Sequence, residues 1–131
     1  MFKSILFPIE LTREARTGIE ITAEMVKIHN SKLTILSVVE PNTPGAMGSE
    51  PQVAKLLEES KSFFASRGIL AQTIEKSGIP AFTICDVADE INADLIIMSC
   101  RGLGLIDEEA AVESVTNRVI NLATCPVLVV S

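Results

Sequence analysis

The sequence predicts an α/β fold in which a five-stranded parallel sheet carries helices on both faces, a three-layer α/β/α arrangement. Short apolar stretches alternate along the chain with segments whose apolar residues recur at helical spacing. Most of the stretches are almost continuously apolar, which is typical of strands buried on both faces of a parallel sheet. A chain of 131 residues can bury one core, and we predict a single domain over residues 1–131.

Five strands are expected in chain order. The apolar stretches are SILFPI (4–9), KLTILSVV (32–39), DLIIMS (94–99) and PVLVVS (126–131). The remaining stretch, ILAQTIEK (69–76), mixes polar and apolar residues, which favours a strand at an edge of the sheet.

Four helices are expected between the strands, each with an apolar face that packs on the sheet. Thr12 is suited to begin the first helix, Gly68 to end the second, and Pro80 to lie in the first turn of the third. The four apolar faces consist of Leu11, Ala15, Ile19 and Val26; Val53, Leu57, Ser60 and Phe64; Ile84, Val87, Ala88 and Ile91; and Val112, Val115, Val119 and Leu122.

Charge and composition exclude several classes of function. The net charge is −6 and the 11 Lys and Arg residues are scattered, so the chain lacks a basic face for nucleic acid or an anionic membrane. It also has no Trp or Tyr on which bases could stack. No apolar run approaches the roughly 20 residues of a membrane span, and the N-terminal residues do not resemble a targeting peptide, so we expect a cytoplasmic protein.

Metal and nucleophile chemistry find little support in the sequence. Cys85, Cys100 and Cys125 lie far apart and form no C-x-x-C pair, and His29 is the one histidine. We expect reduced, buried thiols, no metal site, and His29 at the end of the first helix. No Ser-His-acid or Cys-His set can be assembled, so no catalytic residue is predicted.

Three loops are the candidates for a ligand site. Ligands of doubly wound sheets bind beyond the carboxyl ends of the strands, where the strand order reverses. This points to the segments 8–12, 39–51 and 99–113. The last begins SCRGLG, whose glycines let the backbone approach an anion, and continues with several acidic residues. It is neither a dinucleotide fingerprint nor a P-loop. The residues alone predict an anion-binding loop without catalytic machinery.

Four segments, which cover nearly the whole chain, together resemble a universal stress protein domain. They are KSILFPIE, KLTILSVVEP, GIPAFTICDVADEINADLIIMSCRG and SVTNRVINLATCPVLVV. The resemblance implies an adenine nucleotide alpha hydrolase-like fold. We accordingly predict the strand order 3-2-1-4-5, with strands 69–76 and 126–131 at opposite edges.

The resemblance also implies a nucleotide site at the carboxyl ends of the strands. Nucleotide-binding members of the family have a glycine, two residues, a glycine, nine residues, and a glycine followed by Ser or Thr. Ser99, Gly102, Glu113 and Ser114 occupy these four positions here, and the longer span has one extra residue. Val38 matches a position whose backbone commonly meets adenine, and Glu10 stands where the family usually has Asp. The candidate ligand-binding residues are Pro8, Glu10, Val38, Ser99, Arg101, Gly102, Gly104, Ser114 and Val115.

Departures from the family pattern weaken the expected binding of ATP. A side chain at Ser99 limits how closely the backbone approaches a phosphate, although its hydroxyl can donate a hydrogen bond. Glu113, near the expected start of the last helix, can itself occupy the positive end of the helix dipole. Two like charges about 4 Å apart repel by about 4 kcal/mol at an effective dielectric constant of 20. Asp107, Glu108 and Glu109 add negative charge, whereas Arg101 and the nest formed by Gly102 and Gly104 favour an anion.

We therefore expect a regulator that binds ATP or AMP, with Mg²⁺, weakly or with altered specificity, and that acts by binding. One alternative is a slow metal-assisted ATPase or phosphohydrolase with Asp107, Glu108 or Glu113 as metal ligands. Another is an interaction module without a ligand. The uncharged stretch 126–131 predicts a homodimer, because an open apolar edge strand pairs readily with a second copy, and the resemblance implies the same.

Overall fold

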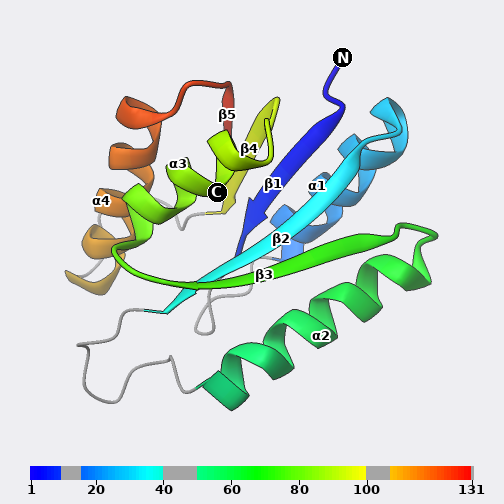
Figure 1. The fold of residues 1–131 in the computed structure, drawn as a ribbon, viewed down its shortest axis with the longest axis horizontal. Helices are drawn as coiled ribbons and strands as arrows, with labels where there is room; N and C mark the ends of the chain where they lie inside the picture. Colours follow the sequence, from blue (N-terminus) through cyan, green and yellow to red (C-terminus); the bar gives the residue numbers. More distant parts are fainter. Residues whose placement is uncertain (10–15, 40–49, 100–106, 131) are drawn as a thin grey trace.

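The computed structural model describes residues 1–9, 16–39, 50–99 and 107–130. The described residues form five strands and four helices that alternate along the chain (Figure 1). In order they are β1 (Ser4–Pro8), α1 (Arg16–His29), β2 (Lys32–Val39), α2 (Glu50–Ser66), β3 (Ala71–Ser77), α3 (Pro80–Glu90), β4 (Leu95–Ser99), α4 (Asp107–Leu122) and β5 (Val127–Val130).

The strands form one parallel sheet in the order β3-β2-β1-β4-β5. The predicted fold class and strand order are confirmed, with β3 and β5 at the two edges. Each strand boundary lies within two residues of the predicted one. β1 is central, because it pairs with β2 on one side and with β4 on the other.

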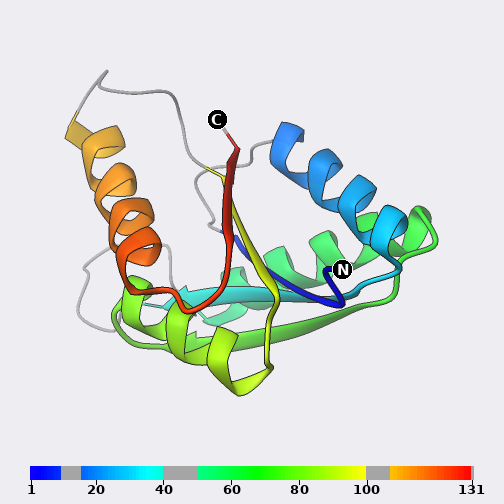
Figure 2. The ribbon, with the colours of Figure 1, turned by 90° about the horizontal axis from the view of Figure 1, so that it is seen from above.

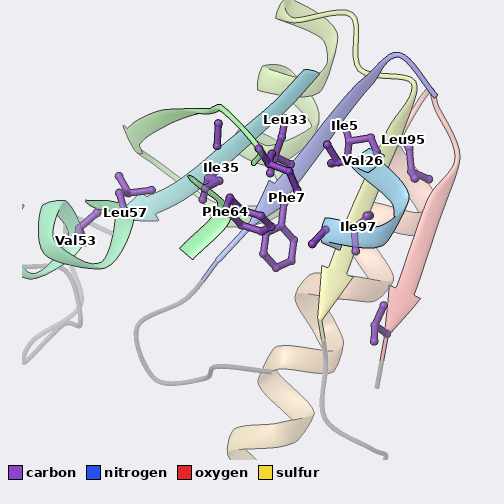
Figure 3. Close-up of a cluster of buried hydrophobic side chains, with 14 residues drawn as sticks. Ile5, Phe7, Val26, Leu33, Ile35, Val53, Leu57, Phe64, Leu95 and Ile97 are labelled. Atoms are coloured by element: carbon purple, nitrogen blue, oxygen red, sulfur yellow. The ribbon is translucent and has the colours of Figure 1, made fainter. Parts of the chain in front are cut away.

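The helices cover both faces of the sheet, with α1 and α2 on one face and α3 and α4 on the other (Figure 2). Beneath α1 and α2 lies the first core cluster (Figure 3), in which the rings of Phe7 and Phe64 meet edge to face with centroids 6.3 Å apart. Its buried members are Ile5, Phe7, Ala23, Val26, Leu33, Ile35, Val53, Leu57, Phe64, Ile69, Ala71, Leu95, Ile97 and Val130.

The second core cluster lies beneath α3 and α4. Neighbouring strand residues such as Ile96 and Ile97 belong to different clusters, because successive side chains of a strand point to opposite faces. This explains why the central strands are apolar at nearly every position. The buried members of the second cluster are Leu6, Leu36, Ala81, Ile84, Cys85, Val87, Ala88, Ile96, Met98 and Val119.

Three helices end by the same backbone arrangement. After α2, Gly68 adopts φ +77°, and the N–H of Ile69 donates to the carbonyl of Phe64 at 2.9 Å. Asn30 and Asn92 adopt φ values of 53° and 54° after α1 and α3. In each case the N–H of the following residue donates to the carbonyl five positions earlier, as Ile69 does after Gly68. Glycine and asparagine tolerate this left-handed conformation best, so the sequence itself stops each helix. Pro80 begins α3 as predicted, where its missing N–H costs nothing.

Two expectations for the last helix need correction. Leu122 was predicted to face the core with Val119, yet its side chain is 43% exposed. Leu122 is the final residue of α4. The residues of this helix end that meet the second core cluster are Val115, Val119 and Ala123, spaced four apart, and Leu122 is not among them. The last helix was expected to start near Glu113, within the candidate loop segment 99–113, whereas α4 already begins at Asp107. Leu11 and Ala15, predicted for the face of α1, lie outside the described residues.

None of the helices in the described part of the chain combines the length and the apolar character that crossing a membrane requires.

Candidate functional site

The candidate site lies at the carboxyl edge of the sheet, where β1, β2 and β4 end at Pro8, Val39 and Ser99. The chain passes from β1 through α1 to β2 on one side, while the other neighbour of β1 is β4. The strand order therefore reverses beside β1, which is the position where doubly wound sheets bind ligands. The fold thus brings the first residues of all three predicted loop segments to one edge.

Two candidate residues lie at the ends of the first two strands. Pro8 closes β1, is half-buried and pairs in register with Leu36. The N–H of Ile9 donates to the carbonyl of Leu36 at 2.8 Å, which carries the β1–β2 pairing one residue beyond Pro8. Val38, the second-last residue of β2, is half-buried and packs against the second core cluster. Val38 thus presents its backbone near the edge while its side chain anchors the strand.

Ser99, the last residue of β4, has the most informative side chain of the candidate set. Its Oγ atom is buried and makes no hydrogen bond within the described residues. A buried hydroxyl without a partner costs about 1–3 kcal/mol, so such groups are rare unless a ligand or solvent satisfies them. Thr34 and Thr116 also have unpaired buried hydroxyls, but Thr34 lies within β2 and Thr116 within α4. Of the three, only Ser99 stands at a strand end.

The first turn of α4 carries the acidic charge of the site. The helix begins at Asp107, followed by Glu108 and Glu109. Glu113 was expected near the helix start, but it lies almost two turns inside the helix. Because dipole effects fall off within the first turn, Glu113 lies too far along the helix for the expected interaction with its positive end. Val115, another candidate residue, is half-buried and packs against the second core cluster.

The remaining candidates cannot be placed as a site. Glu10, Arg101, Gly102 and Gly104 lie outside the described residues. Ser114 lies within α4, but its side chain is outside the description. The described part of the candidate site therefore consists of Pro8, Val38, Ser99 and Val115.

No group of three or more His, Cys, Asp and Glu residues within the described ranges could hold a metal ion. Cys85 is buried and Cys125 half-buried, and both are free thiols. Burial raises the pKa of each thiol, which keeps it protonated at neutral pH. Cys100 lies outside the described residues.

His29 ends α1 at the opposite, amino edge of the sheet. Its ring packs edge-on against Phe2 with centroids 5.1 Å apart. At the same edge, Asp94 accepts hydrogen bonds from the N–H groups of Lys3 and Ser4 at 2.9 and 3.0 Å. The sequence reasoning missed this clamp, for which the only signal is an aspartate directly before a buried strand. It stabilises the start of β1 and lies away from the candidate site.

Comparison with known proteins identifies related chains. The sequence model of the Universal stress protein family matches residues 1–131. Universal stress protein Sll1654 of Synechocystis sp. is 58% identical over 136 residues, which cover 99% of this chain and 86% of that protein. A crystal structure of a universal stress protein in complex with cAMP has a TM-score of 0.78 at 20% identity, covering 98% of this chain and 96% of the other. The universal stress protein from Archaeoglobus fulgidus in complex with dAMP has a TM-score of 0.73 at 19% identity, covering 99% and 98%.

Proposed function

This chain belongs to the universal stress protein family, and we propose that it is a single-domain, cytoplasmic stress regulator that binds an adenine nucleotide at the carboxyl edge of its sheet. Binding, and not catalysis, is its proposed activity. The observation that carries the proposal is the buried hydroxyl of Ser99, which has no hydrogen-bond partner among the described residues and lies at the end of β4, beside the point where the strand order reverses.

The proposed role of Ser99 is to donate a hydrogen bond to the phosphate of the nucleotide. Family members that bind nucleotides have glycine at this position. The serine side chain limits how closely the backbone approaches the phosphate, but its hydroxyl supplies a hydrogen-bond donor that glycine lacks. A hydrogen bond to a charged group contributes about 1.5–3 kcal/mol. Val38 would contribute backbone groups to the base, as the family resemblance implies, and Pro8 and Val115 would border the site.

The proposed ligand carries one phosphate, as AMP or a cyclic mononucleotide does. Three acidic residues occupy the first turn of α4, and a triphosphate bound near the start of this helix would be repelled more than a monophosphate, because the repulsion grows with the charge of the ligand. Two structural neighbours support this choice, since their bound nucleotides, cAMP and dAMP, each carry a single phosphate. ATP would need Mg²⁺ beside it to offset the acidic charge.

Titration calorimetry on two variants tests the proposal. Ser99→Ala removes the unpaired hydroxyl, so we expect the free energy of unfolding without ligand to rise by about 1 kcal/mol. The same change should weaken AMP binding about tenfold or more, because the donor to the phosphate is lost. Thr34→Val is the matched control, since it removes another buried hydroxyl without a partner among the described residues, near the amino end of β2 and away from the carboxyl ends of the strands. It should leave AMP affinity unchanged.

The outcomes separate the rival functions. Equal AMP affinity in the native protein and Ser99→Ala would refute the role of Ser99. No binding of AMP, cAMP or ATP, with or without Mg²⁺, would favour an interaction module without a ligand. Release of phosphate from ATP, abolished by neutralising Asp107 or Glu108, would favour the metal-assisted hydrolase.

We further propose that the protein is a homodimer that pairs through β5. The support is that β5 is an edge strand without charged residues, which would discourage pairing with another strand. Pro126, directly before β5, is the one residue of the stretch 126–130 that cannot donate a backbone hydrogen bond. Val129 is 38% exposed, and Ile120 and Leu122 of the preceding helix are also exposed. A second copy of the strand across a two-fold axis would satisfy its open backbone groups.

A further inference from the structure

Two free thiols lie outside the candidate nucleotide site and within one apolar cluster. Cys85 belongs to α3 and is a buried member of the second core cluster. Cys125 lies in the short connection between α4 and β5, is half-buried, and packs against the same cluster. The two residues come from different elements, 40 positions apart in the chain, and the fold brings them to one region.

Hydrogen bonds fix the position of Cys125 from both sides. Thr124 donates from Oγ1 to Oδ1 of Asp89 at 2.8 Å. Asp89 follows Cys85 by four residues and therefore lies on the same face of α3, one helical turn further on. On the other side, the carbonyl of Pro126 accepts from the N–H of Ile96 at 3.0 Å, which ties the chain to β4. In both views the connection to β5 passes beside α3 (Figures 1 and 2).

We propose that Cys85 and Cys125 are an oxidation-sensitive thiol pair that closes into a disulfide between α3 and the start of β5. Neither residue takes part in the proposed nucleotide site, so this modification site is independent of that function. The pairing is between two parts of one chain, because Cys85 is too buried to reach a second molecule.

The proposed reaction uses a peroxide as the oxidant and balances in two steps. Cys125 is the more accessible thiol. Its thiolate attacks one oxygen of hydrogen peroxide and breaks the O–O bond, which forms a sulfenic acid and releases hydroxide, and the hydroxide takes up the proton that the thiol lost and leaves as water. The sulfur of Cys85 then attacks the sulfur of the sulfenic acid. This forms the S–S bond and releases a second water, which carries away the thiol proton. Overall, two thiols lose two hydrogens and one peroxide becomes two waters.

The surroundings make the pair slow to react at neutral pH. Burial raises the pKa of both thiols, and the nearby carboxylate of Asp89 raises them further. Asp86 and Cys125 itself also raise the pKa of Cys85, and Asp94 that of Cys125. Because the thiolate is the reactive form, the pair should respond to sustained oxidant and not to the resting state of the cell.

The closed bond would span the part of the chain that carries most of the candidate site. Residues 85 to 125 include β4 with Ser99 and the whole of α4. A disulfide would fix the connection before β5 onto α3, and would thereby limit the movement of the edge strand relative to the second core cluster.

Peptide mapping of the full-length protein tests the pair. The native protein is treated with hydrogen peroxide at pH 8.5, alkylated under denaturing conditions and digested without reductant. We expect one cross-linked peptide pair containing Cys85 and Cys125, an intact mass lower by two hydrogens, and recovery of both thiols after reduction. Cys100→Ser is the matched control and should form the same bond. Cys85→Ser should leave Cys125 as a sulfinic or sulfonic acid.

Three results would overturn the proposal. They are a disulfide that includes Cys100, a cross-link between two chains, and oxidation of Cys125 beyond sulfenic acid in the native protein with Cys85 still reduced. Mapping of the native protein decides among them even if a cysteine variant fails to fold.

Discussion

Thr124 and Asp89 join the connection before β5 to α3 through a hydrogen bond of 2.8 Å across 35 positions of sequence. Asp89 is exposed, yet its carboxylate has this defined partner. We predict that Thr124→Val lowers the free energy of unfolding by about 1 kcal/mol, the typical contribution of one such bond. Urea denaturation measures the change.

A double-mutant cycle isolates this bond. With Asp89→Ala already present, Thr124→Val should have little further effect, because the partner is gone. Thr124→Val should also slow formation of the disulfide between Cys85 and Cys125, since it loosens the connection that positions Cys125. Additive stability effects of the two substitutions would show that the bond does not form in solution.

The two thiols predict a loss of stability at alkaline pH. Burial raises the pKa of Cys85 and Cys125 in the folded protein above the ordinary value of 9.0. Above pH 9 the unfolded chain therefore loses these two protons before the folded chain does, so rising pH favours unfolding. The contribution of the thiols is complete below pH 9 and declines as pH rises towards the folded-state values.

Urea denaturation between pH 8 and 10.5, in the presence of reductant, measures this decline. Replacing both cysteines by alanine should make the fall with pH shallower, whatever it does to stability at pH 7. An identical slope in the two proteins would mean that the thiols ionise as readily in the folded state as in the unfolded chain.

The sheet could be predicted from sequence because the pattern of apolar residues in each strand reflects how many of its faces are buried. The continuous apolar run of β4 is typical of a strand covered on both faces. The mixed polar and apolar residues of β3 are typical of a strand at an edge of the sheet. The end of α4 could not be predicted in this way. Leu122 lies three residues after Val119, a spacing compatible with the core face, but the row that packs on the cluster continues at four-residue spacing to Ala123 and leaves Leu122 exposed.

The candidate site was only partly predictable. The strand ends Pro8 and Ser99 follow from the fold, because a parallel sheet collects its carboxyl ends at one edge. The burial of the Ser99 hydroxyl does not, since it depends on neighbours from distant parts of the chain. The start of α4 was predicted too late, because the acidic residues from Asp107 to Glu109 were interpreted as a polar loop. Acidic residues are equally typical of the first turn of a helix, where they lie at the positive end of the helix dipole.

The proposed dimer predicts different effects for neighbouring valines of β5. Val129 is 38% exposed, so Val129→Lys should leave the fold intact and shift the protein to a monomer in sedimentation at micromolar concentration. Its neighbour Val130 is 7% exposed and belongs to the first core cluster. Val130→Lys should therefore unfold the protein by burying a charge. A native monomer, or a dimer that survives Val129→Lys, would contradict pairing through β5.

The acidic first turn of α4 predicts a change in nucleotide preference. We expect the combined variant Asp107→Asn, Glu108→Gln and Glu109→Gln to bind ATP at least tenfold more tightly, about 1.4 kcal/mol, with a smaller gain for AMP. The physical reason is that removing three negative charges relieves a repulsion that grows with the charge of the ligand. The same change should lower stability by about 1 kcal/mol, because acids at a helix N-terminus stabilise the helix. Calorimetry without Mg²⁺ measures both affinities.

A charge-matched control separates the site from net charge. Glu24, Glu58 and Glu59 are exposed on α1 and α2, and replacing all three by Gln removes the same number of charges. This control should raise ATP affinity far less, because charges separated from a ligand by more than about 10 Å are screened at 0.1 M salt. Mg²⁺ should shrink the advantage of the α4 variant, because the bound metal already offsets part of the phosphate charge. Equal gains in the two variants would place the phosphates away from the first turn of α4.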